Sequence, residues 1–256
     1  MFKVVSFNAN GIRAAARKGF FDWFAKQDID VLCVQELKAQ EDQLDDATFN
    51  PEGYYRYCQC AVKKGYSGVA IYSKQKPDKV IDNFDYDLGH HEGRYIQADF
   101  GNLSVVSLYL PSGSSGDERQ AIKYECMAAF EKHLTKIKAS KREFIICGDW
   151  NIVHKEIDIK NWKGNQKNSG CLPVEREWLD KLFGPMEFVD AFREVNQEPH
   201  QYTWWSQRGQ ARANNVGWRL DYQVTTAGLK DKIDSTSIYT AENFSDHAPL
   251  VIDYKF

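Results

Sequence analysis

The sequence predicts an α/β fold in which β-sheets pack on one another and helices cover them from outside. Strand-like apolar runs outnumber helix candidates, which argues against a regular strand–helix–strand repeat. No low-complexity linker, long charge run or repeat of fixed period divides the 256 residues, so one domain spanning 1–256 is expected. A chain of this length buries about three quarters of its unfolded surface, so it needs no disulfide or metal to stabilise its core.

The predicted strands are short apolar runs, rich in β-branched and aromatic residues and bounded by turn-forming residues. They are Lys3–Phe7, Val31–Gln35, Gly68–Tyr72, Tyr95–Phe100, Leu103–Tyr109, Glu143–Cys147, Trp218–Val224 and Leu250–Tyr254. So many strands beside so few helices are typical of sheets packed in layers.

Three segments are helix candidates. The clearest is Asp117–Lys138, where apolar residues recur at helical spacing with charged residues between them. Ile12–Lys26 and Val174–Phe183 are shorter, and Pro173 suits the start of the second. The segment Gly164–Gly170 is rich in Gly, Asn and Ser and is therefore expected to be a loop.

The composition is that of an ordinary globular protein, with 43% hydrophobic and 27% charged residues and a net charge of -3. A dedicated nucleic-acid binder usually carries a strong basic excess, which is absent here. Basic residues of the loops can still form one local positive face. The candidates are Lys63, Lys64, Lys155, Lys160, Lys163, Lys167, Arg208 and Arg212, each of which taken alone is a solvated charge.

The cysteines and the N-terminus indicate a reducing compartment. The 6 cysteines show no CxxC pair and no zinc-like spacing, so reduced and mostly buried thiols are expected. The N-terminal MFKVVSFNANG enters a strand pattern without the apolar stretch of a signal peptide, and no apolar run approaches the length of a membrane span. A cytoplasmic location is therefore expected, associated with the nucleoid if the source is a bacterium.

Polar residues stand at or near the ends of several predicted strands. These residues are Asn8, Glu36, Tyr109, Asp149, Asn151, Asp221, Asp246 and His247. Most have a plain alternative explanation, because Asn and Asp after a strand usually form turns and Glu36 alone suits a solvated loop. Asp221 is harder to explain in this way, because a carboxylate between Leu220 and Tyr222 is costly to bury without a partner.

Taken together, these residue types suit metal-assisted hydrolysis of a phosphodiester. Mg²⁺ prefers oxygen ligands, often one or two carboxylates together with water and a phosphate. Hydrolysis needs an activated water, neutralisation of charge on the phosphoryl oxygens and help for the leaving oxygen. Spacing alone does not show that the side chains converge.

Seven segments, taken in order, resemble the exonuclease III family of apurinic/apyrimidinic (AP) endonucleases, within the endonuclease/exonuclease/phosphatase superfamily. They are SFNANGIRAA (6–15), VLCVQELK (31–38), GYSGVAIYSK (65–74), SLYLPSG (107–113), CGDWNIVHKEIDIKNWKGNQKNSG (147–170), NNVGWRLDY (214–222) and FSDHAPL (244–250). The resemblance spans nearly the whole chain. It implies a four-layer α/β sandwich, with two mixed β-sheets packed face to face and helices on the outside.

The resemblance also implies a metal site and a phosphate contact. Glu36 corresponds to the principal metal ligand and Asp246 to a second, partly through water, with Asn10 as a further candidate. The implied cofactor is Mg²⁺, for which Mn²⁺ can substitute. Asn10 stands where some relatives have an aspartate, so the metal can be held more loosely here. Tyr109 corresponds to a tyrosine that contacts the phosphate or assists the leaving group.

The remaining catalytic roles fall on two groups. Asp149 corresponds to the residue that activates the attacking water, held by Asn8 and Asn151. His247, oriented by Asp221, corresponds to a donor to a non-bridging phosphoryl oxygen. A carboxylate on one imidazole nitrogen fixes the tautomer and favours the imidazolium. Two other assignments stay open: His247 as general base, and Asp149 as a metal ligand.

An enzyme that recognises a missing base needs an apolar pocket for a flipped deoxyribose. Trp204, Trp218 and Leu220 correspond to the pocket of the family, whereas Trp205 is expected to be core. Pocket and core are both credible for Trp218, and its place in NNVGWRLDY favours the pocket.

Further contacts with DNA are implied for Asn165, Asn168 and Arg13. The small Ser169 and Gly170 leave room at the pocket mouth, as in relatives that work mainly as AP endonucleases. Two serines depart from the pattern: relatives can have an asparagine that contacts phosphate and an arginine inserted into the duplex where this chain has Ser112 and Ser115. The grip on the duplex therefore does not carry over.

The resulting hypothesis is Mg²⁺-dependent cleavage 5′ to an abasic site in double-stranded DNA, leaving a 3′-hydroxyl and a 5′-deoxyribose phosphate. Secondary 3′-phosphodiesterase and 3′→5′ exonuclease activities, and a monomeric state, are also expected. The alternatives are a member specialised for 3′ ends, a phosphatase of small phosphoesters, and a catalytically silent DNA-binding protein. The last would be expected to lack Glu36, Asp149 or His247, and all three are present.

Overall fold

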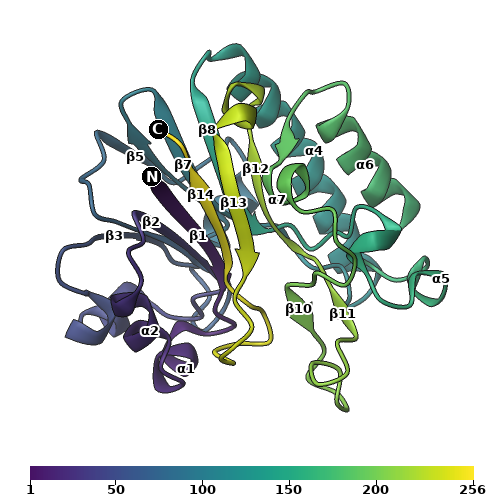
Figure 1. Ribbon diagram of the computed structural model, residues 1–256, viewed down its shortest axis with the longest axis horizontal. Helices are drawn as coiled ribbons and strands as arrows, with labels where there is room; N and C mark the ends of the chain where they lie inside the picture. The colour runs from purple at the N-terminus through teal and green to yellow at the C-terminus, as the bar shows by residue number, and fades with distance from the viewer.

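The computed structural model describes residues 1–256 and contains two six-stranded sheets and one two-stranded ribbon (Figure 1). In spatial order, the first sheet consists of β13 (Ile233–Ile238), β14 (Leu250–Tyr254), β1 (Phe2–Asn8), β2 (Val31–Gln35), β4 (Val69–Ser73) and β3 (Tyr55–Gln59). The second consists of β5 (Lys79–Ile81), β6 (Tyr95–Phe100), β7 (Leu103–Tyr109), β8 (Glu143–Asp149), β12 (Asp221–Thr225) and β9 (Val189–Asp190). The ribbon pairs β10 (Trp204–Trp205) with β11 (Gly217–Trp218).

Both sheets are mixed. In the first sheet β1 pairs with β2 in parallel, and in the second β7 pairs with β8 in parallel; the other pairings are antiparallel. Because the carboxyl ends of parallel strands meet at one edge, the residues after each of these pairs are neighbours. The predicted fold of two mixed sheets with helices is confirmed.

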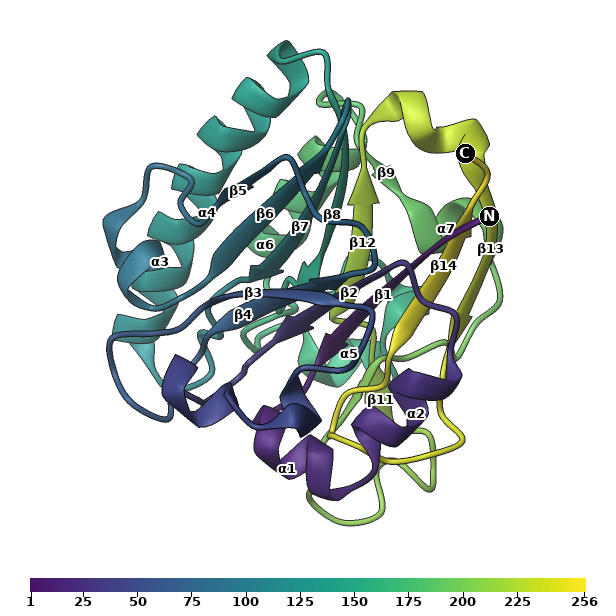
Figure 2. The same ribbon diagram turned by 90° about the vertical axis from the view of Figure 1, so that its left-hand side faces the viewer.

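Most helices lie on the outer faces of the two sheets, whereas the short helix over Ala191–Val195 packs into the core between them (Figure 2). They are α1 (Ile12–Arg17), α2 (Phe20–Lys26), α3 (Asp87–His91), α4 (Asp117–Ala139), α5 (Trp162–Asn165), α6 (Pro173–Phe183) and α7 (Ala191–Val195). Four single-turn or short 3₁₀ segments complete the chain: Glu41–Leu44, Ala47–Phe49, Glu156–Asp158 and Ala227–Lys232. No helix combines the length and the apolar character needed to cross a membrane.

The layers follow from strands that are buried on both faces. In β1, Val4 packs between the two sheets while its neighbours Val5 and Phe7 pack against α1 and α2. In β8, Ile145 faces the space between the sheets and Ile146 faces α4 and α6. Side chains of successive strand residues point to opposite faces, so a strand covered on both faces appears as an unbroken apolar run.

Three expected elements differ from the structure. The helix predicted over Ile12–Lys26 is two helices, because Gly19 adopts a left-handed backbone with φ 86° that an α-helix cannot continue. The strand predicted over Trp218–Val224 is interrupted between β11 and β12. The predicted loop Gly164–Gly170 begins inside the one-turn helix α5. Short or polar elements such as β3, β5, β9, β13 and α7 were not predicted, because they lack a clear apolar period.

The two chain termini lie side by side. They are at the edge of the sheets opposite to the carboxyl ends of β1, β2, β7 and β8. Phe2 in β1 is paired with Tyr254 in β14. β1 then runs to Asn8 at the opposite edge, where the ribbon β10–β11 projects (Figure 1).

Gly148 gives a test of the close packing within the second sheet. A Cβ atom there would lie 2.1 Å from the carbonyl oxygen of Leu108, which is backbone of the neighbouring strand and cannot rotate away. We expect Gly148→Ala to lower the free energy of unfolding by about 2–3 kcal/mol, measured by urea denaturation. Gly164→Ala is the matched control, because a Cβ atom there meets nothing within 4 Å. Equal stability of the two variants would contradict this packing.

Candidate active site

A cavity of about 1030 Å³ lies at the edge where the strand ends of both sheets meet. Most of the predicted site residues line it: Asn10, Glu36, Tyr109, Asp149, Asn151, Asn168, Trp204, Trp218, Leu220, Asp246 and His247. Asn8 and Asp221 lie directly behind this lining, hydrogen-bonded to Asp149 and His247. The structure therefore brings together residues that span nearly the whole sequence.

Asp149, the last residue of β8, is buried and held by two neighbours. Its Oδ2 accepts a hydrogen bond of 2.8 Å from Nδ2 of Asn8, and its Oδ1 accepts one of 2.9 Å from the backbone N–H of Asn151. Asn151 has a left-handed backbone with φ 53°, and its side chain donates to the carbonyl of Leu110. These contacts fix the carboxylate in one orientation.

His247 and Asp221 form a buried pair beside Asp149. Nδ1 of His247 lies 2.8 Å from Oδ2 of Asp221, and Nε2 lies 3.8 Å from Oδ2 of Asp149. The first contact fixes the imidazole ring and leaves Nε2 turned toward Asp149. β12 pairs with β8 so that Asp221 lies opposite Asp149, and this register sets the arrangement.

The pKa values of the pair are strongly perturbed. Burial alone would lower the pKa of His247, but the charge and hydrogen bond of Asp221, with Asp149 and Asp246, raise it to about 10. Burial raises the pKa of Asp149 to about 7, with His247 acting downward and Asp221 upward. Near neutral pH the site therefore holds an imidazolium beside a carboxylate that is ready to accept a proton.

The side chains of Glu36, Asp246 and Asn10 form an oxygen-rich wall on the other side of the cavity. Nδ2 of Asn10 donates to Oδ1 of Asp246 over 2.9 Å. Burial acts to raise the pKa of Asp246, but His247 and hydrogen bonds from Asn10, Ser245 and Trp204 lower it overall. Asp246 is therefore ionised at neutral pH.

This wall fits a hard cation. Nζ of Lys38 lies 3.0 Å from Oε1 of Glu36 and also donates to Oδ1 of Asn10. The oxygens thus already surround one positive charge, and carboxylate and amide oxygens are ligands that Mg²⁺ accepts. Glu36 reaches the cavity through a left-handed backbone with φ 56°, which is uncommon for a residue with a side chain.

Asp149, Asp221 and His247 are a second possible metal group, with potential ligand atoms within 4.8 Å of one another. In this arrangement Nδ1 of His247 is already engaged by Asp221. The imidazolium supplies the positive charge that a cation would bring, so Glu36 and Asp246 suit a metal better.

Tyr109 lies between the two halves of the site. Its ring is 4.8 Å from the guanidinium of Arg94, whose Nη1 donates to the backbone carbonyl of Tyr109 over 3.0 Å. Burial, and then the charge of Glu36, raise the pKa of Tyr109 well above its usual value. The hydroxyl group therefore keeps its proton and can donate a hydrogen bond.

Aromatic and apolar side chains form the third wall. The rings of Trp204 and Trp218 pack edge to face with centroids 6.0 Å apart, and Leu220 lies beside them in the same cluster. Nε1 of Trp204 donates to Oδ2 of Asp246 over 3.2 Å, which ties this wall to the acidic one. Trp205 is buried against Tyr202 and Ala248, in keeping with its expected place in the core.

Of the three further residues predicted to contact DNA, only one lines the cavity. Asn168 lines the cavity, whereas the side chain of Asn165 bonds the carbonyl of Asn161 and the side chain of Asn168. Arg13 is exposed outside the cavity lining, where it donates to the carbonyl of Lys38. Gly170 packs closely against the cavity lining, because a Cβ atom there would lie 3.0 Å from the carbonyl of Asn151 and 3.3 Å from the Trp218 ring.

Four of the eight basic candidates have a defined place near or away from the cavity. Lys167 and Arg208 line the cavity. Lys155 is instead paired with Asp180, and Arg212 stacks over Trp205 and donates to the carbonyl of Ser245. Their charges are used within the protein.

A fully buried ion pair beneath the site escaped sequence reasoning. Nζ of Lys123 donates to Glu175 and, over 2.8 Å, to the carbonyl of Asn151. Oε2 of Glu175 accepts from the backbone N–H of Gly170 over 2.7 Å. The pair therefore connects the loops on both sides of the cavity. In the sequence these residues look like solvated charges of two helices.

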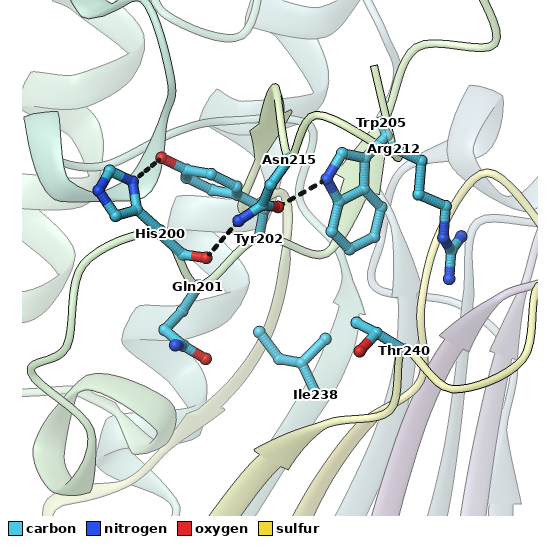
Figure 3. Close-up of a pocket in the computed structure, with 8 residues that line it drawn as sticks. All are labelled: His200, Gln201, Tyr202, Trp205, Arg212, Asn215, Ile238 and Thr240. Atoms are coloured by element: carbon cyan, nitrogen blue, oxygen red, sulfur yellow. Dashed lines mark hydrogen bonds between the residues drawn. The ribbon is translucent and has the colours of Figure 1, made fainter. Parts of the chain in front are cut away.

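A second, smaller cavity of about 380 Å³ does not resemble a reaction site (Figure 3). Its polar groups bond one another: Nδ1 of His200 lies 3.2 Å from the hydroxyl of Tyr202, and Nε1 of Trp205 donates to Asn215 over 3.0 Å. No carboxylate lines it.

Comparisons with known proteins agree with this geometry. Residues 5–247 match the endonuclease/exonuclease/phosphatase family. The chain is similar to an exodeoxyribonuclease of Bacillus subtilis (strain 168), 40% identical over 97% of both chains. It is also similar to DNA repair nuclease APEX1 of Danio rerio, 38% identical over 98% of this chain and 81% of the other. A solved AP endonuclease from Archaeoglobus fulgidus superposes with a TM-score of 0.90 at 28% identity, covering 100% of both chains.

The protonation of His247 can be measured directly. We expect its ring to stay protonated through about pH 8, because its pKa is raised to about 10. Asp221→Asn removes the partner charge, so His247 should then titrate at lower pH. Nitrogen-15 NMR of the ring nitrogens reports both states, and His133, whose pKa burial lowers to about 4, is the internal neutral reference.

Because folding raises the pKa of His247, the protonated ring stabilises the folded protein. This stabilisation is complete below the ordinary pKa of 6.5 and is lost as the pH rises through about 10. Loss of the His247 proton near its ordinary pKa in the unmodified protein would contradict the assigned pairing.

Proposed function

Because the chain belongs to the endonuclease/exonuclease/phosphatase family, we propose that it is a DNA-repair nuclease that hydrolyses the phosphodiester 5′ to an abasic site. The products are a 3′-hydroxyl and a 5′-deoxyribose phosphate. One observation carries the proposal: a fixed Asp149 and an Asp221-held His247 face one cavity together with an acidic wall and an aromatic wall.

Asp149 is the proposed acceptor of the proton from the attacking water. Asn8 and Asn151 hold its two oxygens, so one lone pair can be directed at a water in the cavity. Its pKa of about 7 matches that task near neutral pH. A pKa much lower would make the carboxylate a weaker base, and a higher one would leave it protonated.

His247 and Tyr109 are the proposed donors to the phosphate. Nε2 of the imidazolium can donate to a non-bridging oxygen, where negative charge increases as the water attacks. Asp221 keeps the ring charged and in place throughout. Tyr109 retains its proton and can donate to the phosphate or the leaving oxygen.

Glu36 and Asp246, with Asn10, are the proposed ligands of Mg²⁺, and Mn²⁺ can substitute. Their donors are all hard oxygens, and no cysteine or histidine belongs to this wall. A bound divalent cation neutralises charge on the phosphate. Asn10 adds no charge, so the protein binds the ion with fewer carboxylates than a site with an aspartate at this position.

The aromatic wall supports selection of an abasic nucleotide. Trp204, Trp218 and Leu220 offer an apolar surface beside the catalytic groups, suited to a flipped deoxyribose without its base. Gly170 packs tightly on Trp218 and limits the size of this space. Processing of 3′ ends is a secondary activity of the same catalytic groups, and the protein acts as a monomer on duplex DNA.

The central test compares two substrates. We expect faster turnover, in Mg²⁺, of a duplex with an internal tetrahydrofuran abasic analogue than of a nicked duplex with a blocked 3′ end. EDTA should abolish both reactions, and added Mg²⁺ should restore them. Faster turnover of the 3′-blocked substrate would make end processing the main function, and cleavage in EDTA would remove the metal from the mechanism.

Asp149→Asn tests the proposed base. The amide keeps the shape of the carboxylate but cannot take a proton at neutral pH, so kcat should fall about 10²–10⁴-fold. Binding of the tetrahydrofuran duplex, measured by fluorescence anisotropy, should persist. Asp180→Asn is the control, because Asp180 is half exposed and lies outside the cavity lining. Undiminished cleavage by the Asp149 variant would exclude Asp149 as the base.

A further inference from the structure

Four consecutive residues include two members of the aromatic wall and the partner of His247. Trp218 ends β11 and Asp221 begins β12, with Arg219 and Leu220 between them. Trp218 and Leu220 face the cavity, while Asp221 bonds His247. Any contact that fixes this segment therefore affects both the aromatic wall and the His247–Asp221 pair.

Thr203 supplies hydrogen bonds to the segment between β11 and β12, where the strand is interrupted. Its buried Oγ1 accepts from the backbone N–H groups of Leu220, over 3.0 Å, and of Asp221, over 3.1 Å. Its own N–H donates to the carbonyl of Trp218 over 3.0 Å. Its carbonyl accepts from the N–H of Ala248, the residue after His247, over 2.8 Å.

Arg219 anchors the same segment from the other side. Its side chain is fully buried, and its Nε donates to Asp158 over 2.8 Å. Nη1 and Nη2 donate to the two oxygens of Asp190 over 3.2 and 2.6 Å. The backbone N–H of Arg219 also donates to the carbonyl of Asp158 over 2.8 Å. A bidentate pair of this kind restricts both position and rotation.

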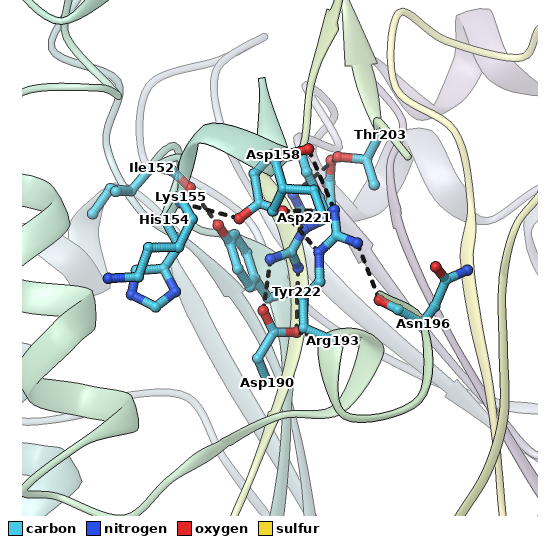
Figure 4. Close-up of polar contacts among 12 residues, drawn as sticks. Ile152, His154, Lys155, Asp158, Asp190, Arg193, Asn196, Thr203, Asp221 and Tyr222 are labelled. Atoms are coloured by element: carbon cyan, nitrogen blue, oxygen red, sulfur yellow. Dashed lines mark hydrogen bonds and ion pairs between the residues drawn. The ribbon is translucent and has the colours of Figure 1, made fainter. Parts of the chain in front are cut away.

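The two acids are themselves fixed by a second arginine. Arg193 pairs with Asp158 over 2.9 Å, and its backbone N–H donates to Asp190. Figure 4 shows Asp158, Asp190 and Arg193 in one group of polar contacts, with Asp221 and Thr203 in the same region. Two arginines balance two aspartates, so the network is neutral and can remain buried.

We propose that Thr203 and Arg219 are positioning residues that couple the aromatic pocket to the His247–Asp221 pair. The inference rests on the proposed function, because it assigns a shared anchor to two parts of that site. If the anchor loosens, Leu220 and Trp218 shift at the pocket while Asp221 loses its alignment with His247. Substrate fit and the chemical step should then deteriorate together.

Thr203→Val is the decisive substitution, with Thr203→Ser as its matched control. Valine keeps the size and branching of threonine but removes the oxygen, leaving two buried N–H groups without their acceptor. We expect kcat to fall about tenfold or more on both the tetrahydrofuran duplex and a nicked duplex with a 3′-phosphate. KM should rise for the tetrahydrofuran duplex alone, since only that substrate fills the pocket.

Serine retains the oxygen, so Thr203→Ser should stay within about threefold of the unmodified protein in both constants. The inference is overturned if the folded valine variant keeps kcat, or keeps KM for the tetrahydrofuran duplex. It is also overturned if serine and valine impair activity equally. A merely structural role would lower the unfolding temperature without separating kcat from KM in this substrate-dependent way.

Asp190→Asn decides the question if the valine variant does not fold. Asp190 touches neither the cavity nor His247, yet the substitution weakens the grip on Arg219. The same pattern of kcat and KM, in milder form, supports the coupling, and unchanged constants overturn it. Failure of the unmodified protein to cut the tetrahydrofuran duplex would instead refute the proposed function, so the two failures are distinguishable.

Discussion

The hydrogen bond from Asn8 to Asp149 joins the two sheets at the edge where the site is formed. Asn8 ends a strand of the first sheet and Asp149 ends a strand of the second, so the bond depends on how the sheets stack. Strand register then places Tyr109 and Asp221 on either side of Asp149. The interleaved aliphatic core between the sheets thus sets the positions of these side chains, and a slip of one residue would turn them to the opposite face.

The same packing explains the electrostatics. Asp149 and Asp221 are buried, with Asp246 half-buried nearby, in a poorly solvated region where isolated carboxylates would be neutralised. His247 balances part of their charge, and Lys38 balances the charge of Glu36 at the outer part of the site. An acidic site must nevertheless accept a polyanion. Lys167 and Arg208 line the same cavity and bring positive charge to it, which lessens that conflict.

Much of this architecture was predictable, because strands buried on both faces leave long apolar runs in the sequence. The interruption between β11 and β12 was not, since the inward turn of Arg219 depends on partners far away in the chain. At the site, single residues such as Glu36 looked like turns or solvated loops, and only seven ordered segments together suggested a nuclease. The buried positions of Thr203, Lys123 and Glu175 could not be predicted, because burial of a polar side chain cannot be inferred from its neighbours in sequence.

The pairing of the first and last long strands has a consequence for how this fold can be extended. Both chain ends emerge at the edge opposite the cavity, because Phe2 pairs with Tyr254 while Asn8 lies at the far end of the same strand. A segment added at either end would leave the molecule on the side away from the cavity. Tags, tethers and accessory modules fused there would therefore not obstruct the cavity, and the fold can be built into larger proteins without redesign of that edge.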